Sequence, residues 1–219
     1  MADFGPTIVG IAGGSGAGKT TFVRRLVDKL PPGPTTILSH DAYYRDLAHR
    51  TPDERATTNF DHPDSLDTRL LCDHIDSLRR GRGVDVPTYD FTTHARTSRT
   101  TRAEPTPTLI VEGILILADE ALRSLFDLAV YIDVEPDARL ARRMERDIRD
   151  RGRSAESVIR QWRETVQPMY NEFVRPSRAF ADVIVPHGGD NRMAARMVAA
   201  FVRGDAPRPD SAAPASRPT

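Results

Sequence analysis

The chain has 219 residues, of which 39% are hydrophobic and 28% charged, as in a soluble globular protein with one core. Its 31 basic residues balance its 31 acidic ones, so the overall charge gives no reason to expect nucleic-acid or membrane partners. A single cysteine, Cys72, excludes an internal disulfide and suits a reducing compartment. The chain opens with no leader-like segment, and no apolar run approaches the ~18 residues of a membrane span. We therefore expect a cytoplasmic protein.

The first predicted strand, residues 7–12, leads into a glycine-rich loop with the P-loop pattern G-x-x-x-x-G-K-[ST]. Backbone N–H groups of such a loop point inward, and the positive end of the following helix adds to the attraction for phosphate. The lysine would reach the β- and γ-phosphates of a nucleotide, and the first threonine hydroxyl would bind Mg²⁺. Only two of the 31 basic residues are lysines, and one stands here, which favours a phosphate site over a chance turn. The predicted nucleotide-binding residues of the loop are Gly13, Gly14, Ser15, Gly16, Ala17, Gly18, Lys19, Thr20 and Thr21.

The helix after the loop is expected to run to about Leu30, where Pro-Pro-Gly-Pro stops it. Residues 35–39 predict a second strand, and Asp41 follows at its C-terminal end, the edge at which open α/β sheets bind ligands. A carboxylate there could accept the proton of an attacking hydroxyl, or it could cap a short helix. We predict Asp41 as the catalytic base, beside Lys19, and as a possible metal ligand.

The next two segments predict a helix and a hairpin. Apolar residues recur at three- and four-residue steps between residues 64 and 80, and Pro63 and Gly81 bracket them. Residues 84–91 alternate like a strand and residues 97–104 could return beside it, so we expect a hairpin insert at about 84–104, as a flap beside the nucleotide site. Two aromatic residues would share a face of this hairpin. Aromatic faces suit a flat heterocycle, although such pairs more often pack in a core.

An apolar strand is predicted at residues 108–115, and it contains one acid, Glu112. An isolated carboxylate in a buried strand would be costly. At the ligand edge of the sheet it could instead face the water shell of Mg²⁺, as a Walker-B acid does. The alternative is a carboxylate that caps the following helix, and we favour the metal role.

Another strand follows at residues 128–134, and Pro136 begins a long helix that is interrupted near residues 151–153. Arginines recur along this helix at steps of three and four, which places them in one stripe. A solvated ion-pair helix is the usual explanation of such a run. Beside a P-loop, we expect a lid over about residues 139–155 that closes on phosphates. The stripe comprises Arg139, Arg142, Arg146, Arg149 and Arg153.

The last part of the predicted domain again alternates between helix and strand. Ser154 opens an amphipathic helix to about Val174, residues 182–186 predict the last strand, and Asn191 caps a helix to about Val202. Residues 204–219 cannot bury an apolar face and are expected to be disordered. The alternation predicts an α/β fold of the P-loop NTPase class, with a doubly wound, mostly parallel sheet in one domain over residues 1–203.

Several motifs occur together and in a fixed order, and with them the chain closely resembles the uridine kinases, also called uridine–cytidine kinases, over about residues 7–203. The P-loop is the first of these motifs. The others are His-Asp-Ala-Tyr-Tyr-Arg-Asp (40–46), Asn-Phe-Asp-His-Pro-Asp (59–64), Pro-Thr-Tyr-Asp-Phe (87–91) followed by His94, Val-Glu-Gly-Ile-Leu (111–115), Arg-Asp-Ile-Arg-Asp-Arg-Gly-Arg (146–153) and Ala-Asp-Val-Ile-Val-Pro (181–186).

The resemblance implies transfer of phosphate from ATP, with Mg²⁺, to the 5′-hydroxyl of uridine or cytidine in pyrimidine salvage. It implies that Asp41 activates this hydroxyl and that Asp61 holds the ribose hydroxyls. The other nucleoside contacts it implies are Tyr89, Phe91, His94, Arg143, Arg153 and Gln161. Arg146 and Arg151 match lid arginines near the phosphates, and Asp190 matches a residue near ATP. Members of the family are often homotetramers, so a homo-oligomer is expected.

Two other interpretations stay open. A P-loop kinase of another small alcohol, phosphoribulokinase-like or pantothenate-kinase-like, would keep Lys19 and the metal acid but has no need of the aromatic pair. A non-catalytic nucleotide sensor or GTPase-like switch would need neither Asp41 nor the arginine lid. The chain also has no Asn-Lys-x-Asp guanine motif. The residues therefore favour the nucleoside kinase.

Overall fold

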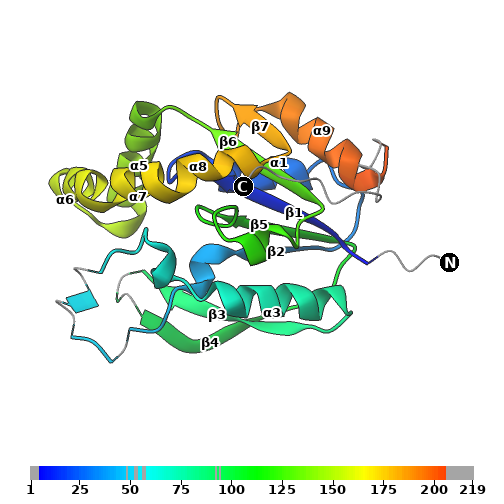
Figure 1. Ribbon diagram of the computed structural model, residues 1–219, viewed down its shortest axis with the longest axis horizontal. Helices are drawn as coiled ribbons and strands as arrows, with labels where there is room; N and C mark the ends of the chain where they lie inside the picture. Colours follow the sequence, from blue (N-terminus) through cyan, green and yellow to red (C-terminus); the bar gives the residue numbers. More distant parts are fainter. Residues whose placement is uncertain are drawn as a thin grey trace.

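In the computed structural model, residues 5–47, 49–51, 54–55, 58–91, 93 and 95–205 are described. Within them, five strands form one sheet in the order β2-β5-β1-β6-β7, and every neighbouring pair is parallel (Figure 1). This arrangement confirms the predicted α/β fold. No helix of the described ranges is both long and apolar enough to cross a lipid bilayer. The strands are β1 (Thr7–Gly13), β2 (Thr35–Ser39), β5 (Thr108–Gly113), β6 (Leu128–Asp133) and β7 (Val183–Pro186).

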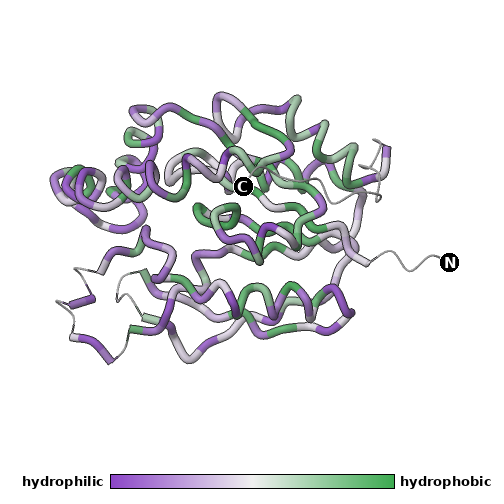
Figure 2. The backbone as a smooth tube through the Cα atoms, viewed as in Figure 1, coloured by the Kyte–Doolittle hydropathy of each residue, from purple (hydrophilic) through white to green (hydrophobic). Residues whose placement is uncertain are grey.

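Helices cover both faces of the sheet because successive strand residues point to opposite sides. In β1, Ile8 packs in one core cluster with α3 (Thr68–Arg79) and α4 (Glu120–Arg123). Val9, the next residue, packs in the other cluster with α1 (Lys19–Val27) and α9 (Arg192–Arg203). Figure 2 shows hydrophobic residues along the central strands and mainly hydrophilic ones at the α5–α6 end. The sheet is thus doubly wound, and its central strands β5, β1 and β6 are buried on both faces.

A two-stranded antiparallel hairpin lies apart from the main sheet, formed by β3 (Val84–Asp90) and β4 (Ala95–Ala103). Arg96 fixes it to η1 (His40–Tyr43), the turn of helix that follows β2. Its guanidinium donates to the main-chain oxygens of Tyr44 at 2.7 Å and Tyr43 at 3.1 Å. The hairpin is therefore held against the segment that carries Asp41.

A long helical region begins at α5 and continues after Gly152, whose φ of 63° ends that helix. Ser154 caps the next helix, because its Oγ accepts a hydrogen bond of 3.2 Å from the Ser157 N–H. Two wider π-type segments, η3 and η4, follow. The elements of this region are α5 (Pro136–Arg151), α6 (Ala155–Gln161), η3 (Trp162–Val166), α7 (Gln167–Met169), η4 (Tyr170–Val174), α8 (Arg175–Ser177) and η5 (Arg178–Phe180).

Two predicted helix boundaries were wrong. The helix expected from residue 64 is split into η2 (Pro63–Ser65) and α3, because Leu66 is extended and forms a β-bridge with Tyr44. The side chain of Asp67 then caps α3 by accepting from the Leu70 N–H at 3.3 Å. The helix α1 ends at Val27, short of the expected Leu30.

The predicted cap of α9 is confirmed, whereas two other predictions concern residues outside the described ranges. The Asn191 side chain caps α9 as predicted, accepting from the Ala194 N–H at 3.0 Å. Residue His94 and most of the predicted tail, residues 206–219, lie outside the described residues. Their predicted roles therefore stay predictions.

Candidate active site

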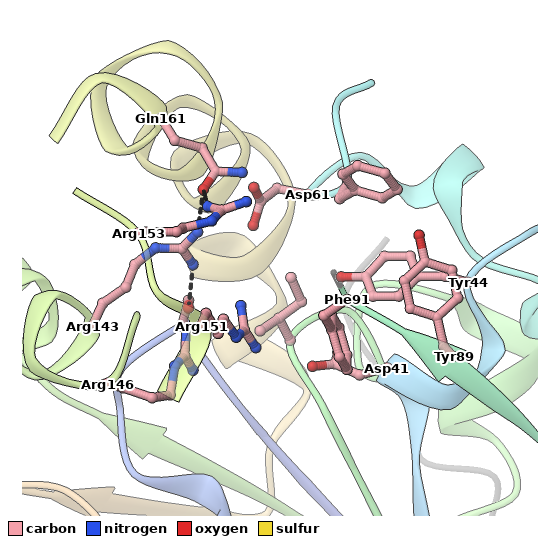
Figure 3. Close-up of a pocket in the computed structure, with 13 residues that line it drawn as sticks. Asp41, Tyr44, Asp61, Tyr89, Phe91, Arg143, Arg146, Arg151, Arg153 and Gln161 are labelled. Atoms are coloured by element: carbon pink, nitrogen blue, oxygen red, sulfur yellow. Dashed lines mark hydrogen bonds between the residues drawn. The ribbon is translucent and has the colours of Figure 1, made fainter. Parts of the chain in front are cut away.

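A pocket that is partly open to solvent lies between the P-loop, the hairpin and the α5–α6 region. In Figure 3 the arginines and Gln161 occupy one side, and Asp41 with the aromatic rings occupies the other. Ten of its thirteen lining residues are predicted site residues, so segments far apart in the sequence do meet here. The lining residues are Ser15, Asp41, Tyr44, Phe60, Asp61, Tyr89, Phe91, Ile114, Arg143, Arg146, Arg151, Arg153 and Gln161.

The P-loop packs tightly against the start of α5. Gly16 has a φ of 81°, and a Cβ at this position would overlap the main-chain oxygen of Arg139. Lys19 Nζ curls back over the loop and donates to the oxygens of Gly13 at 3.1 Å and Gly14 at 3.4 Å. Loss of water lowers the pKa of the Lys19 ammonium, although Glu112 and Asp41 oppose the shift. Both threonines that follow the lysine are exposed at the start of α1.

Two carboxylates lie at the ligand edge of the sheet. Glu112, near the end of β5, accepts a hydrogen bond of 2.8 Å from Ser39 Oγ. Burial raises the pKa of Glu112, the negative charge of Asp41 adds to the rise, and Lys19 opposes it. Asp41 lies inside η1, whose N-cap is Ser39, so Asp41 is not the helix cap considered above.

These oxygen donors fit Mg²⁺, because a hard cation would offset the repulsion between the two carboxylates. Thr20, Asp41 and Glu112 would supply the protein side of the site. Within the described residues no three His, Cys, Asp or Glu side chains cluster as a metal site. This donor set suits Mg²⁺, which usually keeps several waters and binds substrate phosphates rather than a full protein cage.

Asp61 supplies a buried carboxylate to the pocket. The residue is only 8% exposed, and Thr165 Oγ1 from η3 donates to its Oδ2 at 3.3 Å. Burial raises the pKa of the Asp61 carboxyl, and the positive charge of Arg143 opposes the rise. The carboxylate can accept further hydrogen bonds from a ligand with hydroxyl groups.

Aromatic rings form one wall of the pocket. Tyr89 from β3 lies with its ring centroid 5.1 Å from that of Tyr44 and 5.3 Å from that of Phe91. Tyr44 also contacts Phe60, with centroids 5.5 Å apart. Sequence reasoning did not single out Tyr44 or Phe60 as site residues, although both lie inside motifs quoted above. The wall offers apolar faces to a flat ring.

Arginines and one glutamine form the opposite wall. Arg143 donates to Ser15 Oγ of the P-loop at 2.7 Å and to Gln161 Oε1 at 2.8 Å. Arg153 donates to the same Gln161 oxygen. Arg151 places its guanidinium carbon 4.8 Å from the centroid of the Phe91 ring. This wall therefore touches both the phosphate loop and the aromatic wall.

The predicted arginine stripe holds in part: α5 carries Arg139, Arg142, Arg146 and Arg149 at steps of three and four, but the surroundings of these side chains differ. Arg139 is fully buried, with its guanidinium carbon 3.7 Å from the centroid of the Tyr170 ring. Arg149 is exposed and pairs with Asp150, and Arg153 lies beyond the end of α5. The Tyr170 ring of η4 covers Arg139, and the turn at Gly152 ends α5 before Arg153. Spacing along a helix reveals neither feature.

Two further residues lie around the nucleotide loop rather than in this pocket. Asp190 is exposed and forms an ion pair with Arg25 of α1. Arg142 donates to the main-chain oxygen of Ala17 at 3.5 Å. Three neighbouring residues of α5, Arg139, Arg142 and Arg143, thus contact the P-loop.

Comparison with known proteins identifies the family. Residues 8–194 match the model of the Phosphoribulokinase / Uridine kinase family. The chain belongs to this family. The uridine kinase of Streptococcus gordonii is 46% identical over 193 residues, which cover 88% of this chain and 92% of that protein. The uridine kinase of Geobacillus kaustophilus is 46% identical over 198 residues, which cover 90% and 94%.

The fold of the family extends to more distant kinases. The structure of D-glycerate 3-kinase from Cryptococcus neoformans has a TM-score of 0.57 at 17% identity, over 79% of this chain and 80% of that one. At this identity the likeness concerns the fold alone. The family membership confirms the resemblance drawn from the sequence motifs.

Proposed function

We propose that this protein is a uridine–cytidine kinase, which transfers the γ-phosphoryl group of ATP to the 5′-hydroxyl of uridine or cytidine. The observation that carries the proposal is the pocket beside the P-loop. It combines the buried Asp61 carboxylate, an aromatic wall and Asp41 within one cavity. The names of the relatives, uridine kinases at 46% identity, support the same acceptor.

In this proposal the nucleoside base lies against Tyr89 and Phe91, and Asp61 accepts hydrogen bonds from the ribose hydroxyls. Asp41 takes the proton of the 5′-hydroxyl as its oxygen attacks the γ-phosphorus. A bond forms between that oxygen and phosphorus, the bond to the β–γ bridging oxygen breaks, and ADP leaves with the electron pair. The products are ADP and UMP or CMP.

The donor phosphates would be held by the main-chain N–H groups of residues 13–21 and by Lys19. Arg146 and Arg151 would neutralise charge that spreads over the transferred group, and Asp190 would lie near the ATP. With Mg²⁺ bound, its positive charge would offset part of the negative charge of the donor phosphates. Thr20, Glu112 and Asp41 are the residues that would hold it.

We extend the proposal to the domain organisation, location and oligomeric state of the protein. We assign residues 1–203 to one kinase domain, with the hairpin at about 84–104 and the segment at about 139–155 as its closing parts. A cytoplasmic location fits the single cysteine and the ATP substrate, and a homo-oligomer follows from the family resemblance. A phosphoribulokinase-like or pantothenate-kinase-like acceptor is disfavoured because neither has an aromatic base that would need the ring wall.

The acceptor is tested by a coupled ADP-release assay with uridine, cytidine, purine nucleosides, pantothenate and ribulose 5-phosphate. Uridine and cytidine should give the highest kcat/KM. A higher value with pantothenate or ribulose 5-phosphate would replace the proposed acceptor. No ADP release with any of them, together with tight ATP binding, would favour a nucleotide sensor.

The role of Asp41 is tested by Asp41→Asn, which keeps the shape of the side chain but removes the base. Turnover should fall by about 10² or more, because general base catalysis contributes this much, while ATP binding persists. Asp46→Asn, a change of the same chemistry outside the pocket, is the matched control. Near-normal turnover of Asp41→Asn would remove Asp41 from the mechanism.

A further inference from the structure

Asp147 is a buried carboxylate at the centre of the pocket arginines. It lies in α5, and its side chain has no exposed surface. Arg146 donates to its Oδ1 from Nε at 2.9 Å and approaches the same oxygen with Nη2 at 2.8 Å. Arg151 Nη1 is 3.6 Å from Oδ1, and Arg143 Nε is 3.5 Å from Oδ2. One carboxylate thus joins three cations of the pocket.

Arg153, the fourth arginine of the pocket, contacts the main chain of Asp147. The Arg153 N–H donates to the Asp147 main-chain oxygen at 3.1 Å, just after Gly152 turns the chain. This bond sets where Arg153 leaves the helix and so allows its side chain to reach Gln161. All four pocket arginines are therefore positioned with respect to Asp147.

The two carboxylate oxygens contact different arginines. Oδ2 faces Arg143, which binds Gln161 on the nucleoside side and Ser15 of the P-loop. Oδ1 faces Arg146 and Arg151, which the proposed function places at the phosphates. Asp147 therefore links Arg143 to the pair Arg146 and Arg151, because movement of any of these guanidinium groups changes the field and position of the shared carboxylate.

The contact of Asp147 with Arg143 is looser than its contact with Arg146. Arg143 Nε and Asp147 Oδ2 are both buried, and neither has a hydrogen-bond partner within the described residues. Their separation of 3.5 Å is an ion pair without a short hydrogen bond. A nucleoside that repositions Arg143 could shorten this contact and so improve the order of the other two arginines.

We propose that Asp147 is a positioning residue that makes nucleoside and nucleotide bind cooperatively, by holding Arg143 on one side and Arg146 and Arg151 on the other in one buried ion-pair network. This inference rests on the proposed function for the identity of the two ligands. Like charges in a shared pocket repel unless an anion lies between them. Without the carboxylate, the arginines would lose a group that all three contact.

The test measures coupling rather than activity. Dissociation constants of a non-hydrolysable ATP analogue with Mg²⁺ are measured by calorimetry in the absence and presence of saturating uridine. In the wild-type protein uridine should lower the constant by about fivefold or more, and the analogue should lower that of uridine by the same factor. In Asp147→Asn both ratios should fall to near one, while each ligand alone still binds.

The matched control is Asp150→Asn, in the same helix, where the carboxylate is 49% exposed and pairs with Arg149. It should keep the wild-type ratios. A second variant, Arg143→Lys, keeps the positive charge but removes the Nε contact with Asp147, so it should also lose the coupling. If Asp147→Asn does not fold, the coupling measured in Arg143→Lys tests the inference.

Full coupling in Asp147→Asn or in Arg143→Lys overturns the inference, and so does a ratio of one in the wild-type protein. Failure of uridine to bind the wild-type protein at all would overturn both this inference and the proposed function. Uridine binding with no coupling would overturn the inference alone. The two proposals are therefore separated by the same titrations.

Discussion

The donor and acceptor halves of the site are built by different means. The donor half is centred on one run of residues, 13–21, whose main-chain groups and glycine conformations shape the loop. The acceptor half takes side chains from separate elements, with Asp41 in η1, Asp61 before η2, Tyr89 in β3, Phe91 just after it, Arg143 in α5 and Gln161 in α6. One half is local in sequence and the other is assembled by the fold.

Because of this difference, we expect substitutions to affect the two halves in different ways. A main-chain cradle loses its shape when one added methyl group collides with it. A wall made of several side chains shares its contacts, so removal of one ring should weaken binding without abolishing it. Variants in the two halves should therefore differ in size of effect and in which Michaelis constant changes.

The largest effect is expected for Gly16→Ala in the donor half. The added Cβ would overlap the Arg139 main-chain oxygen, and the φ of 81° is disfavoured for alanine. Displacement of the loop by about 1 Å should cost about 10² in kcat/KM for ATP. Steady-state kinetics and thermal melting check this.

Gly81→Ala is the control for the backbone strain alone, because Gly81 has a φ of 73° and nothing within 4 Å of the added Cβ. It should cost about 1 kcal/mol in the free energy of unfolding and leave the kinetics unchanged. Equal loss of activity in both variants would mean that the collision with α5 is not what shapes the loop.

A smaller effect is expected for Phe91→Ala in the acceptor half. Stacking of a base on an aromatic ring is worth about 1–3 kcal/mol, so the KM for uridine should rise about tenfold. The KM for ATP should stay the same. Met197→Ala, at a 63% exposed position on α9, is a control that should change neither constant. A rise confined to the ATP constant would contradict the assignment of the aromatic wall.

The smallest effect concerns pH and the acceptor half. Asp61 must be ionised to accept two ribose hydrogen bonds, and burial raises the pKa of its carboxyl above the ordinary value. As the pH falls, Asp61 therefore takes up its proton earlier than an exposed aspartate, and the KM for uridine should rise. Asp61→Asn should bind uridine more weakly and lose this acid dependence. If the dependence persists in the variant, another group such as Glu112, whose pKa is also raised, is responsible.

The same difference decides how much could be predicted from the sequence. The P-loop, its flanking strand and helix, and the position of Glu112 are local patterns, and they lie in the fold as expected. The place of Tyr44 in the pocket depends on the hairpin, which Arg96 brings against η1. No periodicity in β4 marks Arg96 for this contact, so sequence reasoning passed over it.

The arginines of α5 show the same limit. By spacing, Arg139 and Arg146 belong to one stripe and look equivalent. In the structure Arg139 is buried and Arg146 lines the pocket, because the rings of Trp162 and Tyr170 arrive from a later helix and cover the first of them. The start of α3 was predicted wrongly for a similar reason, since a β-bridge to Tyr44, just after η1, keeps Leu66 extended.

Buried Arg139 has one more consequence, which concerns ionic strength. Its charge lies against the phosphate loop between aromatic faces, and the ions of the solvent do not reach it. Arg146 of the pocket has a side chain that is 37% exposed, and dissolved salt screens its attraction for anions over about 10 Å at 0.1 M. Salt should therefore weaken the effect of Arg139 on the loop much less than the effect of Arg146.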